Sequence, residues 1–158
     1  LIFRLAWVYD DIGKNFPKTI LKAAKAKDQL TVVDDQIGTP SSADFIANTM
    51  HQFIASKNTS NEPRFNSIYN LVPDGAASWF EFTLCLLSRA EAMGFKLECK
   101  AEDVIPIKSL HLVQPAKRPQ CVVLDNRKIQ KALGIRFAPW DAYVDGFLER
   151  MRRQNDKI

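Results

Sequence analysis

The polar and cationic side chains best placed to bind an anion follow the first apolar segment of the chain. Residues 1–9 are mostly apolar and aromatic, which predicts a strand, and the polar residues 10–14 lead from it to Asn15. Asn15 is a residue type that caps helix N-termini, and Pro17 fits a first helical turn, where its missing N–H costs nothing. A helix N-terminus presents free N–H groups and about half a positive charge, so this strand–loop–helix unit predicts an anion site. Lys18, on the same helix, either reaches a phosphate or lies on the solvated helix surface.

Arg118 is the second cationic candidate. It lies between Pro115 and Pro119, which restrict the backbone of the loop around it. Its planar guanidinium pairs well with phosphate oxygens, and a charge-assisted bond of this kind contributes roughly 1.5–3 kcal/mol. The plain alternative is an arginine on an exposed loop.

Alternating strands and helices must position these residues. Apolar periodicity and turn residues predict strands at 1–9, 31–33, 65–72, 104–107 and 121–124. They predict helices at 15–28, from Ser41 with Asp44 three residues later, from Ser78 with Glu81 to Gly94, from Asp125 to Gly134, and from Pro139 onward. The alternation indicates an α/β fold with a helical C-terminal end.

Composition excludes several classes of function. The net charge of +4 comes from 22 basic and 18 acidic residues, too small and dispersed an excess to predict a nucleic-acid partner. Residues 1–158 show no signal-peptide pattern and no apolar run of 18 residues, so we expect no membrane partner. Cys85, Cys99 and Cys121 have neither C-x-x-C nor zinc spacing, and His51 and His111 have no matching ligand set. The sequence therefore predicts no metal site among the cysteines and histidines, and a reducing, cytoplasmic environment.

Six blocks of the chain together resemble one enzyme family. In order they are RLAWVYDDIGKNF (4–16), DDQIGTPSSAD (34–44), IYNLV (68–72), SWFEF (78–82), PAKRPQCVVLD (115–125) and KALGIRFAPW (131–140). They resemble the dTDP-4-dehydrorhamnose reductases, extended short-chain dehydrogenases that reduce a nucleotide-linked keto sugar. The resemblance implies that residues 1–158 form a single C-terminal substrate-binding portion of a larger reductase. Its strands at 1–9 and 65–72 would form the edge portion of a Rossmann-like parallel sheet, beside a small α/β substrate-binding domain with C-terminal helices.

The resemblance also implies a substrate site built from six side chains: Trp7, Asn15, Phe16, Lys18, Gln36 and Arg118. The tryptophan would lie against the sugar ring, and the two residues at the helix N-terminus would face the nucleotide diphosphate. The glutamine amide would border the nucleotide, where it could read the edge of a base by two hydrogen bonds. Four of these side chains also have a purely structural explanation. The tryptophan could simply pack in the core, Asn15 and Phe16 could simply cap the helix and pack against its first turn, and the glutamine could simply stabilise a turn.

The family reaction needs parts that this chain does not contain. The family's Gly-rich cofactor loop and its catalytic Tyr-x-x-x-Lys lie upstream of the first block, and none of the three tyrosines here has a lysine four residues later. We therefore expect a separate N-terminal dinucleotide-binding domain as partner and no catalytic residue in this chain, so that the isolated chain is inactive. The parent reductase would use NADPH or NADH to convert dTDP-4-dehydro-rhamnose to dTDP-rhamnose, for cell-surface polysaccharide. Asp44 matches a position where some members bind magnesium at a homodimer contact; its alternative role is to complement the helix dipole.

Some residues differ from the family pattern. Leu5 and Ala6 replace a Thr-Ser pair close to the meeting point of nicotinamide and substrate, Asp10 replaces a glycine, and Leu112 replaces a tyrosine. These differences bear on the sugar that is bound and on activity. Two other functions stay open: a catalytically silent regulatory or nucleotide-sugar-binding protein on the same scaffold, and another nucleotide-sugar epimerase or reductase.

Overall fold

The protein folds as helices packed around short strands, as an α/β chain should. The computed structural model describes residues 1–56, 66–111 and 118–155. Within these residues the strands are β1 (Ile2–Arg4), β2 (Val8–Tyr9), β3 (Leu30–Val33), β4 (Ile37–Gly38), β5 (Ser41–Ser42), β6 (Ile68–Asn70), β7 (Ala77–Ser78), β8 (Val104–Ile107) and β9 (Cys121–Val122). The helices are α1 (Phe16–Ala24), α2 (Ala43–Ala55), α3 (Trp79–Ala92), α4 (Arg127–Leu133) and α5 (Val144–Asn155), and a 3-10 turn at Trp140–Tyr143 precedes α5.

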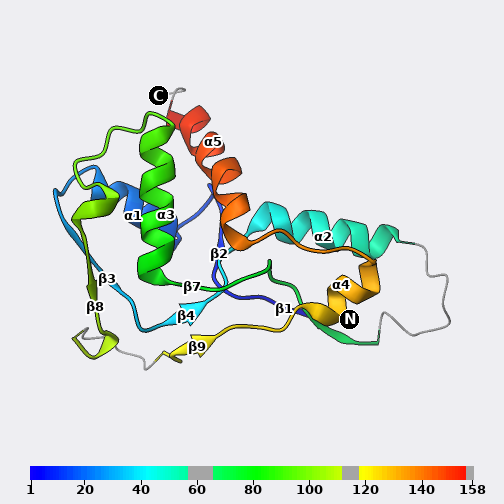
Figure 1. The fold of residues 1–158 in the computed structure, drawn as a ribbon. Coiled ribbons are helices and arrows are strands. Elements are labelled where there is room, and N and C mark those ends of the chain that lie inside the picture. Colours follow the sequence, from blue (N-terminus) through cyan, green and yellow to red (C-terminus); the bar gives the residue numbers. More distant parts are fainter. Residues whose placement is uncertain (57–65, 112–117, 156–158) are drawn as a thin grey trace.

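The strands pair mostly in parallel, in small sheets. β1 pairs with β6, β2 with β5 and β3 with β8, each in parallel. β4 lies between β7, which is antiparallel to it, and β9, which is parallel. Parallel neighbours need long crossover connections, so each pair joins segments far apart in the chain (Figure 1). The α/β class and the parallel pairing of the first strand with the strand near residue 70 confirm the sequence prediction.

The predicted strand at 1–9 is divided in two. Trp7 has φ of 43°, a left-handed backbone conformation that is uncommon for a residue other than glycine. The change of direction at this residue lets β1 pair with β6 and β2 pair with β5. A single apolar run therefore serves two sheets, which the apolar pattern alone did not reveal.

Local capping signals account for most helix boundaries. Ser78 caps α3 in a capping box with Glu81, as predicted, and Gly134 closes α4 in the left-handed conformation. Two predicted starts are wrong by one residue: the N-cap of α2 is Ser42 rather than Ser41, and that of α4 is Asn126 rather than Asp125.

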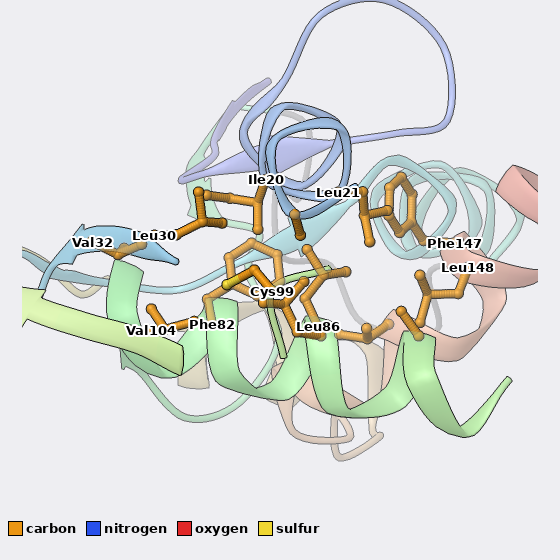
Figure 2. Packing of buried hydrophobic residues seen from close by; sticks show 14 of the residues in the cluster. Ile20, Leu21, Leu30, Val32, Phe82, Leu86, Cys99, Val104, Phe147 and Leu148 are labelled. Carbon is orange, nitrogen blue, oxygen red and sulfur yellow. The ribbon is translucent and has the colours of Figure 1, made fainter. Parts of the chain in front are cut away.

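The larger hydrophobic core lies between α1, α3, α5 and β3. In Figure 2, Phe82 and Leu86 of α3 point toward α1, which carries Ile20 and Leu21. Phe147 of α5 closes one side of this core and Leu30 of β3 another. Burying one such side chain contributes about 1.5–3 kcal/mol, so this core holds the two helices whose N-terminal ends border the cleft described next.

A second core lies under α2. It joins Phe45 and Phe53 of α2 to Tyr69 of β6 and to Ile129 of α4. Figure 1 places α2 and α4 at the opposite end of the molecule from α1 and α3. The segment that carries Trp7 passes between the two cores, because β1 belongs to the second and β2 to the first.

Candidate functional site

A cleft of about 580 Å³ opens where β2, the N-terminus of α1 and the N-terminus of α3 meet. Its lining combines aromatic faces, polar side chains and two cations; among them are Trp7, Tyr9, Lys14, Asn15, Phe16, Gln36, Trp79, Phe82 and Arg118. A space of this volume suits a small-molecule ligand, and aromatic walls with a few polar groups are typical of such sites.

A second cleft of about 580 Å³ adjoins the first. The two share the side chains of Trp7, Gln36, Trp79 and Arg118, and the second adds Arg4, Leu5, Ala6, Pro119, Val122 and Leu124. The added wall is largely apolar, so it suits the less polar part of a ligand. The four shared residues therefore lie where an elongated ligand that occupies both clefts would pass.

Trp7 and Trp79 form a stacked pair at this junction. Their ring centroids are 3.5 Å apart and the planes are inclined by only 8°. Phe16, at the start of α1, lies against Trp79 with centroids 4.4 Å apart. A Cβ added at Gly38 would lie 2.4 Å from Cε2 of Trp7, so the indole rests directly on the glycine backbone. Trp7 is thus fixed from two sides, by Gly38 and by Trp79.

Gln36 is held by the same pair. It is only 7% exposed, and the indole Nε1–H of Trp79 donates to its Oε1 at 3.3 Å. The predicted turn residue is therefore a buried amide at the wall of both clefts, with a defined hydrogen-bond partner.

The N-terminus of α1 is built as predicted. Asn15 is the N-cap, and its Oδ1 accepts from the backbone N–H of Lys18 at 3.2 Å. Its Nδ2 donates to the carbonyl of Asp10 at 2.5 Å, which fixes the preceding loop. The Nζ of Lys18 donates to the carbonyl of Asp11 at 2.6 Å, and Lys18 is not part of either lining. The nearby cation on the lining is Lys14 instead.

The loop before α1 is also tied to the C-terminal helix. The guanidinium of Arg150 donates from Nε to Asp11 at 2.7 Å, donates to Asp44, and lies 3.5 Å from Asp10. Burial alone would raise the pKa of Asp11, but hydrogen bonds from Arg150 and Asp10 outweigh it and hold that pKa below its usual value. The pKa of Asp10 is raised, first by burial and then by its hydrogen bond with Asp11.

This arrangement does not suit magnesium at Asp44. The carboxylate already faces a permanently charged guanidinium, which would repel a divalent cation placed beside it. Within the described ranges, no group of three or more His, Cys, Asp or Glu side chains could hold a metal ion.

Tyr9 belongs to the core rather than to proton chemistry. Its ring packs against Phe82 and Phe147, with centroids 5.3 and 5.4 Å away. Burial raises the pKa of its hydroxyl well above the usual value. The chemistry that the described residues of the clefts offer is therefore binding: aromatic faces, an amide, a helix N-terminus and two cations.

Five of the six predicted site residues, all except Lys18, line the first cleft: Trp7, Asn15, Phe16, Gln36 and Arg118. Sequence reasoning missed Lys14 and Trp79. Trp79 stands in the SWFEF block directly after the predicted N-cap Ser78, and this block of the family resemblance is the signal that could have identified it. Leu112 lies outside the described residues.

Comparisons with known proteins agree on one family. The family model described as "RmlD substrate binding domain" matches residues 1–153. The chain is 31% identical over 152 residues to a dTDP-4-dehydrorhamnose reductase of Shigella flexneri, covering 96% of this chain and 49% of that protein. It is 36% identical over 140 residues to the one of Aggregatibacter actinomycetemcomitans, covering 89% and 47%. The chain thus spans about half the length of the curated relatives it matches.

Solved structures agree in fold. A dTDP-4-dehydrorhamnose reductase ortholog from Clostridium acetobutylicum matches with a TM-score of 0.74 and 27% identity, over 96% of this chain and 48% of that one. The enzyme of Bacillus anthracis in complex with NADP matches with a TM-score of 0.78 and 24% identity, over 94% and 48%. A UDP-glucuronic acid 4-epimerase of Bacillus cereus shares the fold alone, at 14% identity and a TM-score of 0.62. Among the helices of the described residues, none is both long and apolar enough to cross a membrane.

Proposed function

The chain belongs to the RmlD substrate-binding domain family, and from that premise we propose that it is the substrate-binding portion of a dTDP-4-dehydrorhamnose reductase. It binds dTDP-4-dehydro-rhamnose, and the whole reductase converts this sugar nucleotide to dTDP-rhamnose for polysaccharide biosynthesis in the cytoplasm. The hydride comes from NADPH or NADH. The chain's partners are the dTDP-sugar, the dinucleotide-binding portion and a second copy in a homodimer.

The stacked Trp7–Trp79 pair at the junction of the two clefts is the observation that carries this proposal. The rings of Trp7 and Trp79 line both clefts and give a sugar ring apolar surface to pack against, while Arg118 and Lys14 supply positive charge for a diphosphate. The N-terminus of α1, capped by Asn15, adds the positive end of the helix dipole on the same side. The combination fits a nucleotide diphosphate joined to a sugar better than a free sugar or a free phosphate.

The residues of this chain bind and orient the substrate in the proposed reaction. Trp7 and Phe16 line the first cleft with aromatic surface, and Gln36 supplies a fixed amide. The six glycines of the chain do not form a G-x-x-G-x-x-G loop, so these residues do not fit the pyrophosphate of the cofactor. Proton transfer to the sugar is likewise left to the catalytic Tyr-x-x-x-Lys of the dinucleotide-binding portion.

Calorimetry with the purified chain tests the binding. We expect dTDP to bind and UDP to bind more weakly. Arg118→Ala should lower the affinity for dTDP by about tenfold or more, because a charge-assisted bond to phosphate contributes at least about 1.5 kcal/mol. Arg152→Ala is the matched control, since Arg152 is exposed on α5 and lines neither cleft. Tighter binding of UDP than of dTDP, or equal losses in both variants, would contradict the proposal.

A turnover assay tests whether catalysis requires the dinucleotide-binding portion. The 158-residue chain, given dTDP-4-dehydro-rhamnose and NADPH, should oxidise no cofactor. Measurable turnover by this chain alone would show that a proton donor lies within it.

A catalytically silent nucleotide-sugar-binding protein is the second candidate. It is favoured by Leu5 and Ala6, whose apolar side chains line the second cleft at the positions where the family resemblance places hydroxyls. This candidate predicts that the whole protein containing this chain binds dTDP but does not reduce the dTDP-sugar, whereas the first predicts both.

A further inference from the structure

Trp79 is held in place by its own helix and by two neighbouring aromatic rings. It is the first residue of α3, and the capping box of Ser78 and Glu81 fixes the backbone at that point. Its ring is stacked on Trp7 at 3.5 Å and lies beside Phe16 at 4.4 Å. Three elements, α1, α3 and the segment between β1 and β2, therefore restrain one indole.

The restrained indole determines which way the amide of Gln36 points. An indole N–H is a donor only, so the amide atom 3.3 Å from Nε1 must be the carbonyl oxygen. The Gln36 side chain lies in the wall of both clefts and is 7% exposed, so it has little room to turn. With Oε1 engaged by Trp79, the atom left to a ligand is Nε2 with its two N–H groups.

We propose that Trp79 is a positioning residue for ligand recognition: it holds Trp7 in place and fixes Gln36 so that the amide donates to an acceptor oxygen of the ligand. This inference rests on the proposed function for the identity of the ligand, a thymidine diphosphate sugar. The oxygens that would accept are the carbonyls of the base and the oxygens of the diphosphate. Gln36 then selects against a ligand that offers a donor at the same place, because two facing donors would both lose their partners.

Two conservative substitutions separate this role from a merely structural one. Trp79→Phe keeps an aromatic ring against Trp7 but removes the indole N–H. Gln36→Glu keeps the size of the side chain and an oxygen for Trp79, but replaces the N–H donors by an acceptor. Trp140→Phe is the control for loss of an indole, since Trp140 packs on Phe82 and lies on neither lining.

Calorimetric titration with dTDP should give a defined order of affinities. W140F should bind within about twofold of the wild-type chain, W79F about three- to tenfold more weakly, and Q36E at least about tenfold more weakly. In the Q36E background, W79F should cost no further affinity. The two carboxylate oxygens of a glutamate are equivalent, so Trp79 has no amide orientation left to fix. Wild-type affinity in W79F, or the same loss in both backgrounds, would overturn the inference. Titrations with thymidine and with pyrophosphate then distinguish the two sources of the oxygen by which of them is sensitive to Q36E.

Proton NMR of the free chain makes the inference independent of the nucleotide. The indole N–H of Trp79 should show cross-peaks to the side chain of Gln36, and W79F should shift the two amide protons of Gln36. Absence of these signals would overturn the inference even if dTDP binds. Failure of the wild-type chain to bind dTDP with these signals present would instead contradict the proposed function.

Discussion

The Nε of Arg150 lies 2.7 Å from the carboxylate of Asp11, although the two residues are 139 positions apart in the chain. This contact joins α5 to the loop that precedes α1, and the same guanidinium reaches Asp44 at the start of α2. The loop carries Lys14 and leads to Asn15, both of which line the first cleft. One arginine of the last helix therefore supports the segment that delivers the proposed diphosphate contacts.

Arg150→Ala should destabilise the protein by about 1.5–3 kcal/mol, the usual contribution of a hydrogen bond to a charged group. The cause is the loss of the cation that lies among the carboxylates of Asp10, Asp11 and Asp44. Urea denaturation followed by circular dichroism measures the change. Arg153→Ala is the control on the same helix, because its ion pair with Glu149, at 3.9 Å, is exposed and should contribute under about 1 kcal/mol. Equal effects of the two substitutions would refute the supporting role.

Gly38→Ala should disrupt the tryptophan pair. The new Cβ would meet the rigid ring of Trp7 at 2.4 Å, and Trp79 stacked on that ring prevents it from moving aside. Such overpacking costs about 1–3 kcal/mol, measured by urea denaturation, and dTDP affinity should fall with it. Gly146→Ala, in α5, is the matched substitution: its Cβ would meet nothing closer than 3.8 Å, and alanine is favoured in a helix by about 0.5–1 kcal/mol. If G38A is as stable as the wild-type chain, the contact between Trp7 and Gly38 is not as described.

Ser78→Ala should weaken the start of α3. Ser78 Oγ accepts from the backbone N–H of Glu81 at 3.0 Å, and the loss of an N-cap costs about 0.5–2 kcal/mol. Because Trp79 follows directly, the near-ultraviolet circular dichroism of the tryptophan pair should weaken as well. Ser88→Ala, at an exposed position of the same helix, should leave both the stability and this signal unchanged. A near-ultraviolet change in S88A but not in S78A would count against the link between cap and stack.

Asp125 should contribute to the loss of folding stability that occurs as the pH falls into the acid range. Hydrogen bonds from the side chain and backbone of Arg127 lower its pKa from 3.8 to about 2. A carboxylate whose pKa is lower in the folded state stabilises the fold above pH 3.8, and this contribution is lost as the pH falls toward about 2. Denaturation midpoints measured across that range should therefore fall less steeply in Asp125→Asn than in the wild-type chain.

Two checks accompany this pH series. Arg127→Ala removes the partner of Asp125, so it should flatten the same part of the curve. High salt should reduce the effect, because the pair is exposed. If the denaturation midpoint depends on pH in the same way in D125N and wild type, other carboxylates account for the loss of stability in acid.

Structural features that depend on a few neighbouring residues were predicted correctly. The capping box of Ser78 and Glu81, the closing Gly134 and the strand at 104–107 all depend on neighbours in sequence, and all three are confirmed. The family resemblance, carried by six blocks in order, is confirmed by the match to the family model.

The wrong predictions involve residues used by distant partners. Ser41 has the composition of an N-cap, but it pairs with Val8 in β5, and its hydroxyl donates to the carbonyl of Thr39. Ser42 therefore caps α2 in its place. The strand at 1–9 divides at Trp7 because its two ends pair with different strands: β1 pairs with β6, and β2 pairs with β5.

The candidate site was only partly predicted, because some of its contacts join distant parts of the chain. The helix cap and the proline-flanked loop indicated Asn15 and Arg118, and the family resemblance added Trp7, Phe16 and Gln36. The role of Trp79 depends on its stacking with Trp7 and its bond to Gln36, which appear only when the chain is folded. Whether these residues, together with Phe16 and Lys18, contact a substrate stays a prediction.

The parallel pairing of β4 with β9 also sets the order in which the clefts form during synthesis. A ribosome makes Ile37 and Gly38 before their partners Cys121 and Val122, which follow 84 positions later in the chain. Arg118 emerges just before them, and Arg150 later still. A nascent chain therefore carries one wall of the site for several seconds before the other arrives. The proposed nucleotide-sugar ligand can therefore stabilise only a chain in which both walls of the site are present.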